Sequence, residues 1–158
     1  MTTGQCTGTL EFGAAVASDN CAVHAITQTG GLSNLTTVNA STNTITFFAT
    51  DTSNNNASCS FTVQVRDEEA PHIVCPSNVN VNTIPGTCVA QANYTSPTGT
   101  DNCPGPSTTR LTGGAPLSNF SRGTTTVWFM AVDSVGNNAN CSFSVTVADN
   151  ELPTISTY

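Results

Sequence analysis

Charged side chains are scarce in this sequence of 158 residues, and those present are mostly acidic. Asp, Glu, Lys and Arg make up 8% of the residues, only three of them are basic, and the formal net charge is -7. Nucleic acids and anionic membranes attract clustered positive charge. We therefore expect neither as a partner.

Long apolar runs are also missing. No stretch approaches the roughly 20 apolar residues of a membrane-spanning helix, and Met1 is followed directly by polar residues instead of a charged and then apolar signal segment. We expect no membrane insertion, and we expect the chain to be a mature fragment or an internal part of something longer.

Residues suited to catalysis or zinc binding are few. The two histidines, His24 and His72, do not recur at each other's positions, and no Cys-x-x-Cys pair is present. A hydrolase must bring a nucleophile, a base and an orienting group together, and a structural zinc site needs four clustered ligands. We expect both histidines on the surface, no zinc site and no enzyme activity.

The apolar residues follow the period of strands. No segment of helical length has a convincing helical period. Short β-branched and aromatic runs alternate with Gly, Pro, Asn and Asp clusters, which is typical of an all-β sandwich. The expected first strand is Pro71 to Pro76, and a second run follows through Val79 and Val81. The clearest strand is 124–133, followed by a Gly- and Asn-rich turn at 134–138 and by residues that alternate inward over 141–147.

The sequence repeats itself, and every recurring motif is separated from its copy by the same number of positions, the repeat offset. Residues 67–76 (DEEAPHIVCP) return as residues 149–158 (DNELPTISTY), and Cys6, Cys21 and Cys59 return as Cys88, Cys103 and Cys141, without insertion or deletion. We expect an incomplete module at 1–66 that lacks its opening strand, a complete module at 67–148, and the first strand of a following module at 149–158.

Four motifs in the complete module resemble a known family. They are Asp-x-Glu-x-Pro-x-Ile-x-Cys-Pro at 67–76, Asp-Asn-Cys at 101–103, Ala-x-Asp-x-x-Gly-Asn at 131–137 and Cys-x-Phe-x-Val at 141–145. The chain resembles tandem hyalin repeat (HYR) modules, which implies immunoglobulin-like extracellular β-sandwiches. It departs from the pattern at Asn54, which replaces Gly136, and at Thr157 and Tyr158, which replace Cys and Pro.

The seven cysteines indicate disulfides. Cys6 and Cys21 have the same short separation as Cys88 and Cys103, as in a local clip within each module. Cys75 and Cys141 both point inward on the expected first and last strands, so we expect them to bond. Cys59 would remain unpaired, because Thr157 replaces its partner. The alternative is that these are free thiols for redox chemistry.

Six Asn-x-Ser/Thr sequons indicate an N-glycosylated protein of the extracellular space or cell surface. They begin at Asn34, Asn39, Asn56, Asn93, Asn119 and Asn140.

Acidic residues at the ends of strands have two interpretations. Asp51 and Asp133 precede Asn-rich turns, where a carboxylate commonly accepts backbone N–H bonds. Alternatively they bind Ca²⁺ together with the linker acids, since clustered carboxylates suit this ion. The linker candidates are Asp67, Glu68, Glu69, Asp149 and Glu151. We expect no other cofactor.

Trp128, Met130 and Val132 form an outward apolar row where the first module has Thr46, Phe48 and Thr50. Such a row can be a contact surface. The alternative is that a loop or a glycan of the same module covers it.

The mismatch between the two ends of the chain suggests head-to-tail self-association. The first module lacks a first strand, and the chain carries a spare one, with Leu152, Pro153, Ile155, Thr157 and Tyr158 as its assembly residues. We expect a structural extracellular glycoprotein that forms a fibre, filament or appendage by β-strand complementation. The alternatives are a cell-adhesion or ligand-binding ectodomain and an appendage of an extracellular enzyme.

Overall fold

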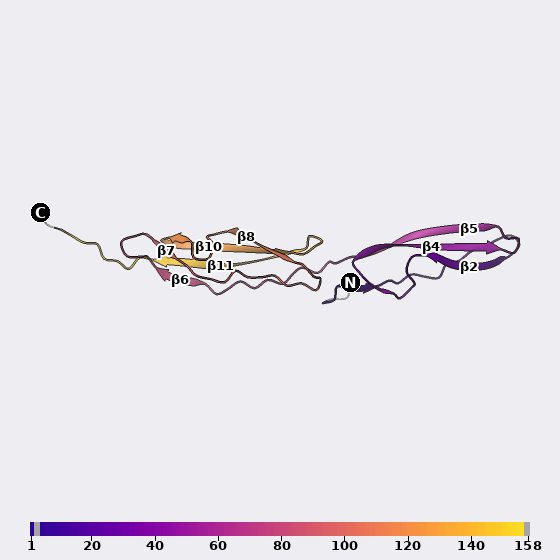
Figure 1. Cartoon of the computed structure of the whole chain (residues 1–158), viewed down its shortest axis with the longest axis horizontal. Helices are drawn as coiled ribbons and strands as arrows, with labels where there is room; N and C mark the ends of the chain where they lie inside the picture. Colours follow the sequence, from indigo (N-terminus) through magenta and orange to yellow (C-terminus); the bar gives the residue numbers. More distant parts are fainter. Residues whose placement is uncertain (2–3, 157–158) are drawn as a thin grey trace. The chain divides into compact units, whose positions relative to one another are not determined.

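The computed structural model describes residue 1 and residues 4–156, so Thr157 and Tyr158 of the expected assembly strand lie outside the described residues. The chain divides into two compact units, Met1–Glu68 and Glu69–Tyr158 (Figure 1). The secondary structure of the described residues is built from strands, which confirms the all-β sandwich class. Within the same residues, no helix has the length and apolar character needed to cross a membrane.

The second unit contains a sheet of four strands in the order β6-β11-β10-β8 and a smaller sheet of β7 and β9. The strand bounds are β6 Val79–Asn82, β7 Val89–Gln91, β8 Ser107–Thr112, β9 Asn119–Ser121, β10 Gly123–Val132 and β11 Asn138–Ala148.

Alternation along β10 and β11 builds the core of this unit. Val127 and Phe129 on β10 and Phe143 and Val145 on β11 are buried, as expected for residues that share one face of a pleated sheet. Ile73, from the segment before β6, packs into the same cluster. Trp128, on the opposite face of β10, is 43% exposed.

The first unit has a sheet of three strands in the order β2-β4-β5 and a smaller sheet of β1 and β3. The bounds are β1 Thr7–Thr9, β2 Val23–Gly30, β3 Thr37–Asn39, β4 Ser41–Asp51 and β5 Asn56–Val65. Its β4–β5 ladder runs from Ser41↔Val65 to Thr50↔Asn56, and the β10–β11 ladder runs from Gly123↔Val147 to Val132↔Asn138. Adding the repeat offset to the residue numbers of each end pair of the first ladder gives the corresponding pair of the second ladder.

An aromatic trio is repeated in the same way. Tyr94 contacts Phe143 and Phe129 with ring centroids 4.8 and 6.4 Å apart. At the equivalent positions in the first unit, Phe12 contacts Phe61 at 5.6 Å and Phe47 at 6.4 Å. Phe12 and Tyr94 were not among the predicted core residues, although two aromatic residues separated by the repeat offset are a usable signal.

The expected opening strand, Pro71 to Pro76, does not form a ladder, which corrects that assignment. Its one bridge joins His72 to Thr100, and the strand beside β11 is instead β6, which runs parallel to it. The reason is that the prolines at both ends lack a backbone N–H and cannot donate to a ladder. Likewise, the spare segment at 149–156 contains no strand.

Candidate functional site

The outer edge of β5 is the principal difference between the two units. In the second unit, β6 pairs with β11 from Val145↔Val79 to Ala148↔Asn82. Among the described residues, β5 pairs only with β4 and has no strand on its other side. An edge of this kind presents free N–H and C=O groups that can template an added strand.

A hollow lies at each end of this open edge. One, of about 460 Å³, is lined by Gly8, Thr9, Val63 and Val65 together with neighbouring residues. Their counterparts in the second unit include Ala90, Val145 and Val147, which belong to the core cluster against which Val79 and Val81 of β6 pack. The hollow therefore lies where a strand equivalent to β6 would sit.

The other hollow, of about 240 Å³, is lined by residues that include Ala17, Ser18, Ala49 and Ala57. Ala49 and Ala57 correspond to Ala131 and Ala139. In the second unit, Ala131 belongs to the buried cluster that contains Ile73, and Ala139 packs against that cluster. This hollow therefore has the lining expected of a socket for a residue equivalent to Ile73.

The candidate occupant of this second hollow is the segment that follows β11, in which Ile155 corresponds to Ile73. Leu152 is 84% exposed and Ile155 is 93% exposed. The start of the segment is held to its own unit, because Thr83 Oγ1 donates to Asp149 Oδ1 at 3.4 Å and Gly86 N donates to Glu151 Oε2 at 2.7 Å. The segment thus begins at a fixed point and presents apolar side chains to solvent.

The disulfides differ in part from the expected set. Cys75 and Cys141 are bonded, with Cα atoms 5.6 Å apart. Cys6 and Cys103 are each in a disulfide, whereas Cys21, Cys59 and Cys88 are free and exposed. The expected clips Cys6–Cys21 and Cys88–Cys103 are therefore wrong.

The clips fail because the chain between these cysteines runs along the sandwich instead of turning back. Cys88 lies next to β7 at the end where β11 finishes, since Thr83 N bonds to Ala148 O. Cys103 precedes β8, whose first residue pairs with Val132, and Val132 pairs with the first residue of β11. The length of β11, 11 residues at about 3.3 Å each, separates the two cysteines, and a disulfide requires Cα atoms within about 7 Å.

Asp133 organises the turn between β10 and β11. Its Oδ1 accepts bonds from the backbone N of Val135, Gly136 and Asn137 at 2.7–2.9 Å, and its Oδ2 accepts one from Asn137 Nδ2 at 2.7 Å. Burial opposes ionisation, but the bonds from Asn137 and the other backbone donors outweigh it and hold the pKa of Asp133 below its usual range. Both oxygens of this carboxylate therefore accept hydrogen bonds from the turn, which is the turn role expected of Asp133.

Asp51 has the same role with fewer donors. Asn55 donates its side-chain and backbone N–H groups and Ser53 its backbone N–H. The side-chain bond from Asn55 is the main cause that lowers the pKa of Asp51.

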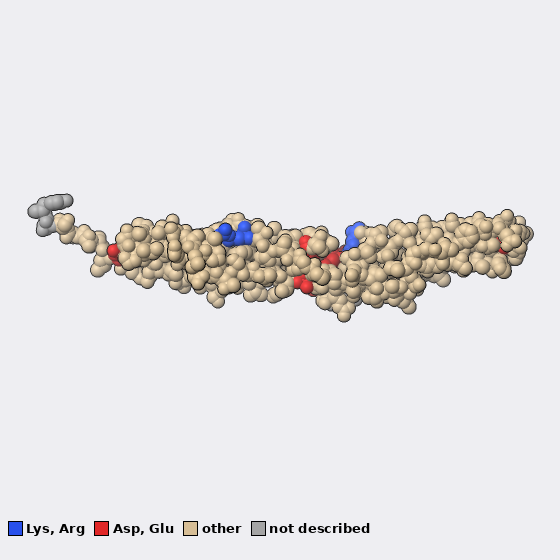
Figure 2. Space-filling model, in the orientation of Figure 1, with Lys and Arg blue, Asp and Glu red and all other residues tan. Residues whose placement is uncertain are grey.

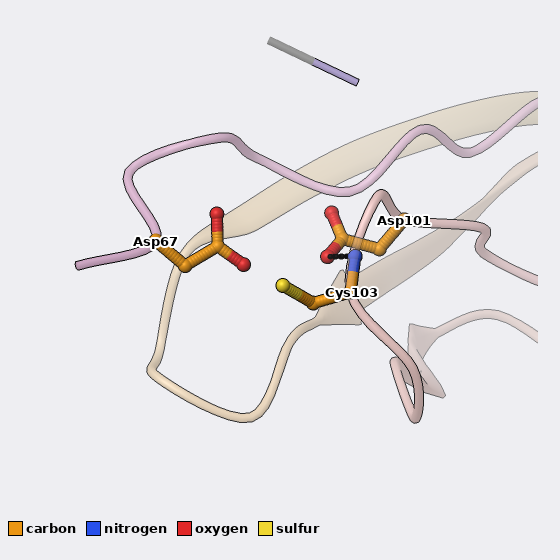
Figure 3. Close-up of side chains that lie close together, drawn as sticks. All are labelled: Asp67, Asp101 and Cys103. Carbon is orange, nitrogen blue, oxygen red and sulfur yellow. Dashed lines mark hydrogen bonds between the residues drawn. The ribbon is translucent and has the colours of Figure 1, made fainter. Parts of the chain in front are cut away.

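Asp67, Asp101 and Cys103 place one ligand atom each within 4.8 Å of the others (Figure 3). Cys103 N donates to Asp101 Oδ2 at 2.9 Å. The Cys103 sulfur is part of a disulfide, so it cannot act as the thiolate that a metal site of this kind would need. Of the other calcium candidates, Asp149 and Glu151 accept the protein hydrogen bonds described above, and Glu69 is half-buried.

The remaining predicted residues lie on the surface. His24 and His72 are exposed, as are the asparagines of all six sequons. Met130 and Val132 are half-buried beside the exposed Trp128. Figure 2 shows how few charged atoms occur on the visible face of the protein.

Comparison with known proteins gives one family and two relatives. The family model of the HYR domain matches residues 66–147. Hyalin of Strongylocentrotus purpuratus is 39% identical over 118 residues, which cover 71% of this chain and 10% of the relative. A protein of Mus musculus, named sushi, von Willebrand factor type A, EGF and pentraxin domain-containing protein 1, is 33% identical over 104 residues, which cover 65% of this chain and 3% of that protein. The chain thus spans a small part of either relative.

Proposed function

Because the chain belongs to the HYR domain family, we propose that it is a repeat unit of an extracellular structural glycoprotein whose copies join head to tail by β-strand donation. The relatives, the Cys75–Cys141 disulfide and the family support an extracellular or cell-surface module of the adhesion type. Self-association and N-glycans on the six exposed sequons are part of the proposal.

The incomplete core beside β5 is the observation that carries this proposal. The first unit repeats the ladder register and the aromatic trio of the second, yet Phe61 is 39% exposed whereas its counterpart Phe143 is 4% exposed. Residues 149–158 correspond to residues 67–76, which precede β6, so the donated segment would cover this core with apolar side chains and would not form a ladder along β5.

The spare segment has the residues that this seat requires. In the second unit, His72 and Thr100 exchange two backbone bonds of 2.7 and 2.8 Å. At the repeat offset, Thr154 of the donor would exchange the same bonds with Ser18 of the acceptor. Ile155 would then occupy the hollow lined by Ala49 and Ala57, as Ile73 occupies its place in the second unit.

Donor and acceptor lie in different units of the chain, so the contact joins two different surfaces. A heterologous contact that does not close into a ring propagates into an open filament. The same seat would serve within a longer polypeptide, where the preceding module supplies the strand covalently. Particle length from the 158-residue chain distinguishes these two geometries.

The test is the deletion of residues 152–158 followed by negative-stain electron microscopy and sedimentation. We expect filaments from the full chain and monomers with an unstable first unit from the truncated one. Ile155→Asp should act like the deletion, because burial of an unpaired carboxylate is costly. The matched control is Leu117→Asp, which places the same charge at an apolar loop position that is 60% exposed. Filaments of normal length from the truncated chain would rule strand donation out.

A second candidate function is a ligand-binding or cell-adhesion module of a larger protein. The exposed Trp128 favours it, because tryptophan is a frequent anchor at protein interfaces. Monomeric protein that binds cells or matrix through Trp128, without forming filaments, would support this candidate over the first.

A further inference from the structure

Two free cysteines occupy positions whose counterparts in the other unit form disulfides. Cys21 and Cys88 are exposed thiols. Their counterparts at the repeat offset are Cys103 and Cys6, and both of these are bonded. Each free thiol therefore stands at a position that this fold uses for a disulfide.

The local structure supports the equivalence of these positions. Cys21 N donates to Asp19 Oδ2 at 2.9 Å, and Cys103 N donates to Asp101 Oδ2 at the same distance. Cys6 directly precedes β1, which pairs Thr7 with Asn39, and Cys88 directly precedes β7, which pairs Val89 with Ser121. These pairs coincide at the repeat offset, so the cysteines occupy matching places in matching folds.

Strand donation brings the positions of Cys21 and Cys88 to one joint. Asp67, which precedes the second unit in the chain, lies beside Asp101 and Cys103, as Figure 3 shows. Asp149 corresponds to Asp67, and Asp19 and Cys21 correspond to Asp101 and Cys103. A donated strand seated in the same way would bring Asp149 to Cys21 of the acceptor.

On the donor side, Asp149 lies close to the turn that leads to Cys88. Asp149 accepts the bond from Thr83, and Glu151 accepts the bond from Gly86, which closely precedes Cys88. The turn is closed by a bond from Thr87 N to Ile84 O of 2.9 Å. Asp149 therefore lies near the turn that carries Cys88 and, in the joint, would also lie near Cys21 of the acceptor.

We infer that Cys88 of one copy forms a disulfide with Cys21 of the next copy and locks the head-to-tail joint covalently. This inference rests on the proposed strand donation. The two thiols lose two protons and two electrons to a small-molecule disulfide such as oxidised glutathione, which leaves as two thiols while the new S–S bond forms. Both thiols are exposed, so the oxidant can reach them before the joint closes.

The test uses the whole chain with Cys59→Ser as the background, so that the third free thiol cannot react. After oxidation by oxidised glutathione, we expect a ladder of covalent oligomers on a non-reducing gel and a Cys21–Cys88 peptide by mass spectrometry. Adding Cys21→Ser or Cys88→Ser to the background should abolish the ladder. A mixture of these two variants should give linked dimers and nothing longer, because each variant keeps only one half of the bond.

Electron microscopy of the same samples separates this inference from the proposed function. Filaments from the background protein that contain no ladder and no Cys21–Cys88 peptide would overturn the cross-link and leave strand donation standing. Filaments from both serine variants, with the ladder lost, would support the cross-link. A ladder that survives deletion of residues 152–158 would overturn it, because the bond would then not depend on the joint. Absence of filaments from every sample would overturn the proposed function and the cross-link together.

Discussion

Strands β5 and β11 carry nearly the same sequence pattern but differ sharply in burial. In β11, Phe143 is 4% exposed and Val145 is 0% exposed, and Cys141 is in a disulfide. In β5, Phe61 is 39% exposed, Val63 is half-buried and Cys59 is a free thiol. The ladders have the same register and the aromatic trios occupy the same positions, so the strand itself is not the cause of the difference.

The cause is the segment that precedes the sheet. Residues 71–82 supply Ile73, Cys75 and strand β6 to the second unit, and these cover one side of β11. Alternation in a strand therefore fixes which face points inward, whereas burial also requires a neighbour that covers that face. If this one segment accounts for the difference between the units, equivalent substitutions in the two units should have unequal effects.

The largest expected effect is on the core aromatic ring. Phe143→Ala should destabilise the second unit by about 3–5 kcal/mol, as for other buried Phe residues. Phe61→Ala should cost less, because 39% of that residue is already exposed to water. Urea unfolding followed by the fluorescence of Trp128, the one tryptophan, reports the second unit, and hydrogen exchange of the β4 amides reports the first. Equal losses in the two units would contradict the comparison.

The disulfide should have the next largest effect. Replacing both Cys75 and Cys141 by Ser removes a bond between residues 66 positions apart, which the chain-entropy treatment values at about 4 kcal/mol. Cys59→Ser, the equivalent change in the first unit, should leave stability nearly unchanged. The urea midpoints of the variants and the wild type provide the measurement. A comparable loss from Cys59→Ser would show that this thiol has a bonded partner.

Removing the turn carboxylates should also lower the free energy of unfolding by different amounts in the two units, and the effects should be smaller than that of the disulfide. Asp133→Ala leaves three partly buried backbone N–H groups of the turn without their acceptor, so we expect a loss of about 1–3 kcal/mol. Asp51→Ala should cost less, because Asp51 is more exposed and accepts bonds from two backbone N–H groups. Urea unfolding at neutral pH tests this ranking, and equal losses would contradict it.

The pH dependence of this contribution follows from the lowered pKa of Asp133. The pKa of an Asp in the unfolded chain is about 3.9, and the pKa of Asp133 in the folded protein is lower than this ordinary value. The folded state therefore favours the carboxylate, and its stabilisation is complete above the unfolded pKa and is lost as pH falls through the folded pKa. Asp133→Asn should flatten the stability profile below about pH 4. An unchanged acid slope in this variant would assign the slope to other groups.

The sequence predicted the parts of the fold that depend on local pattern. The alternation in 124–133 and in 141–147 predicted the faces of β10 and β11, and the motifs predicted the family. The acceptor role of Asp51 and Asp133 also followed from their position before Asn-rich turns. Each of these features is determined within a single strand and the turn that adjoins it.

Features set by distance along the sandwich could not be predicted in this way. The short spacing of Cys88 and Cys103 resembled a local clip, but the chain between them runs the length of the unit. The pairing of β6 with β11 was missed for a similar reason, because its strand-like alternation does not specify which edge it joins. The hollows at the edge of β5 exist because no described residues of the first unit cover that edge. No motif in the sequence of the first unit predicts this.

The smallest expected effect on stability is at Trp128, where the two units differ on their outer faces. Trp128 lies between Ser142 on β11 and Thr112 on β8, and the first unit has Thr46 at this position. Trp128→Thr should change stability by no more than about 0.5 kcal/mol, as is usual for surface positions, but should weaken filament bundling or ligand binding if the row is a contact surface. Asn140, opposite Met130, carries a sequon on the same face, so Asn140→Gln is the variant that tests whether a glycan covers the row. Quantitative microscopy and cell-binding assays on both variants provide the measurement. Unchanged assembly and binding in Trp128→Thr would mean that the outer row is not an interface, and the functional difference between the units would then be confined to the edge of β5.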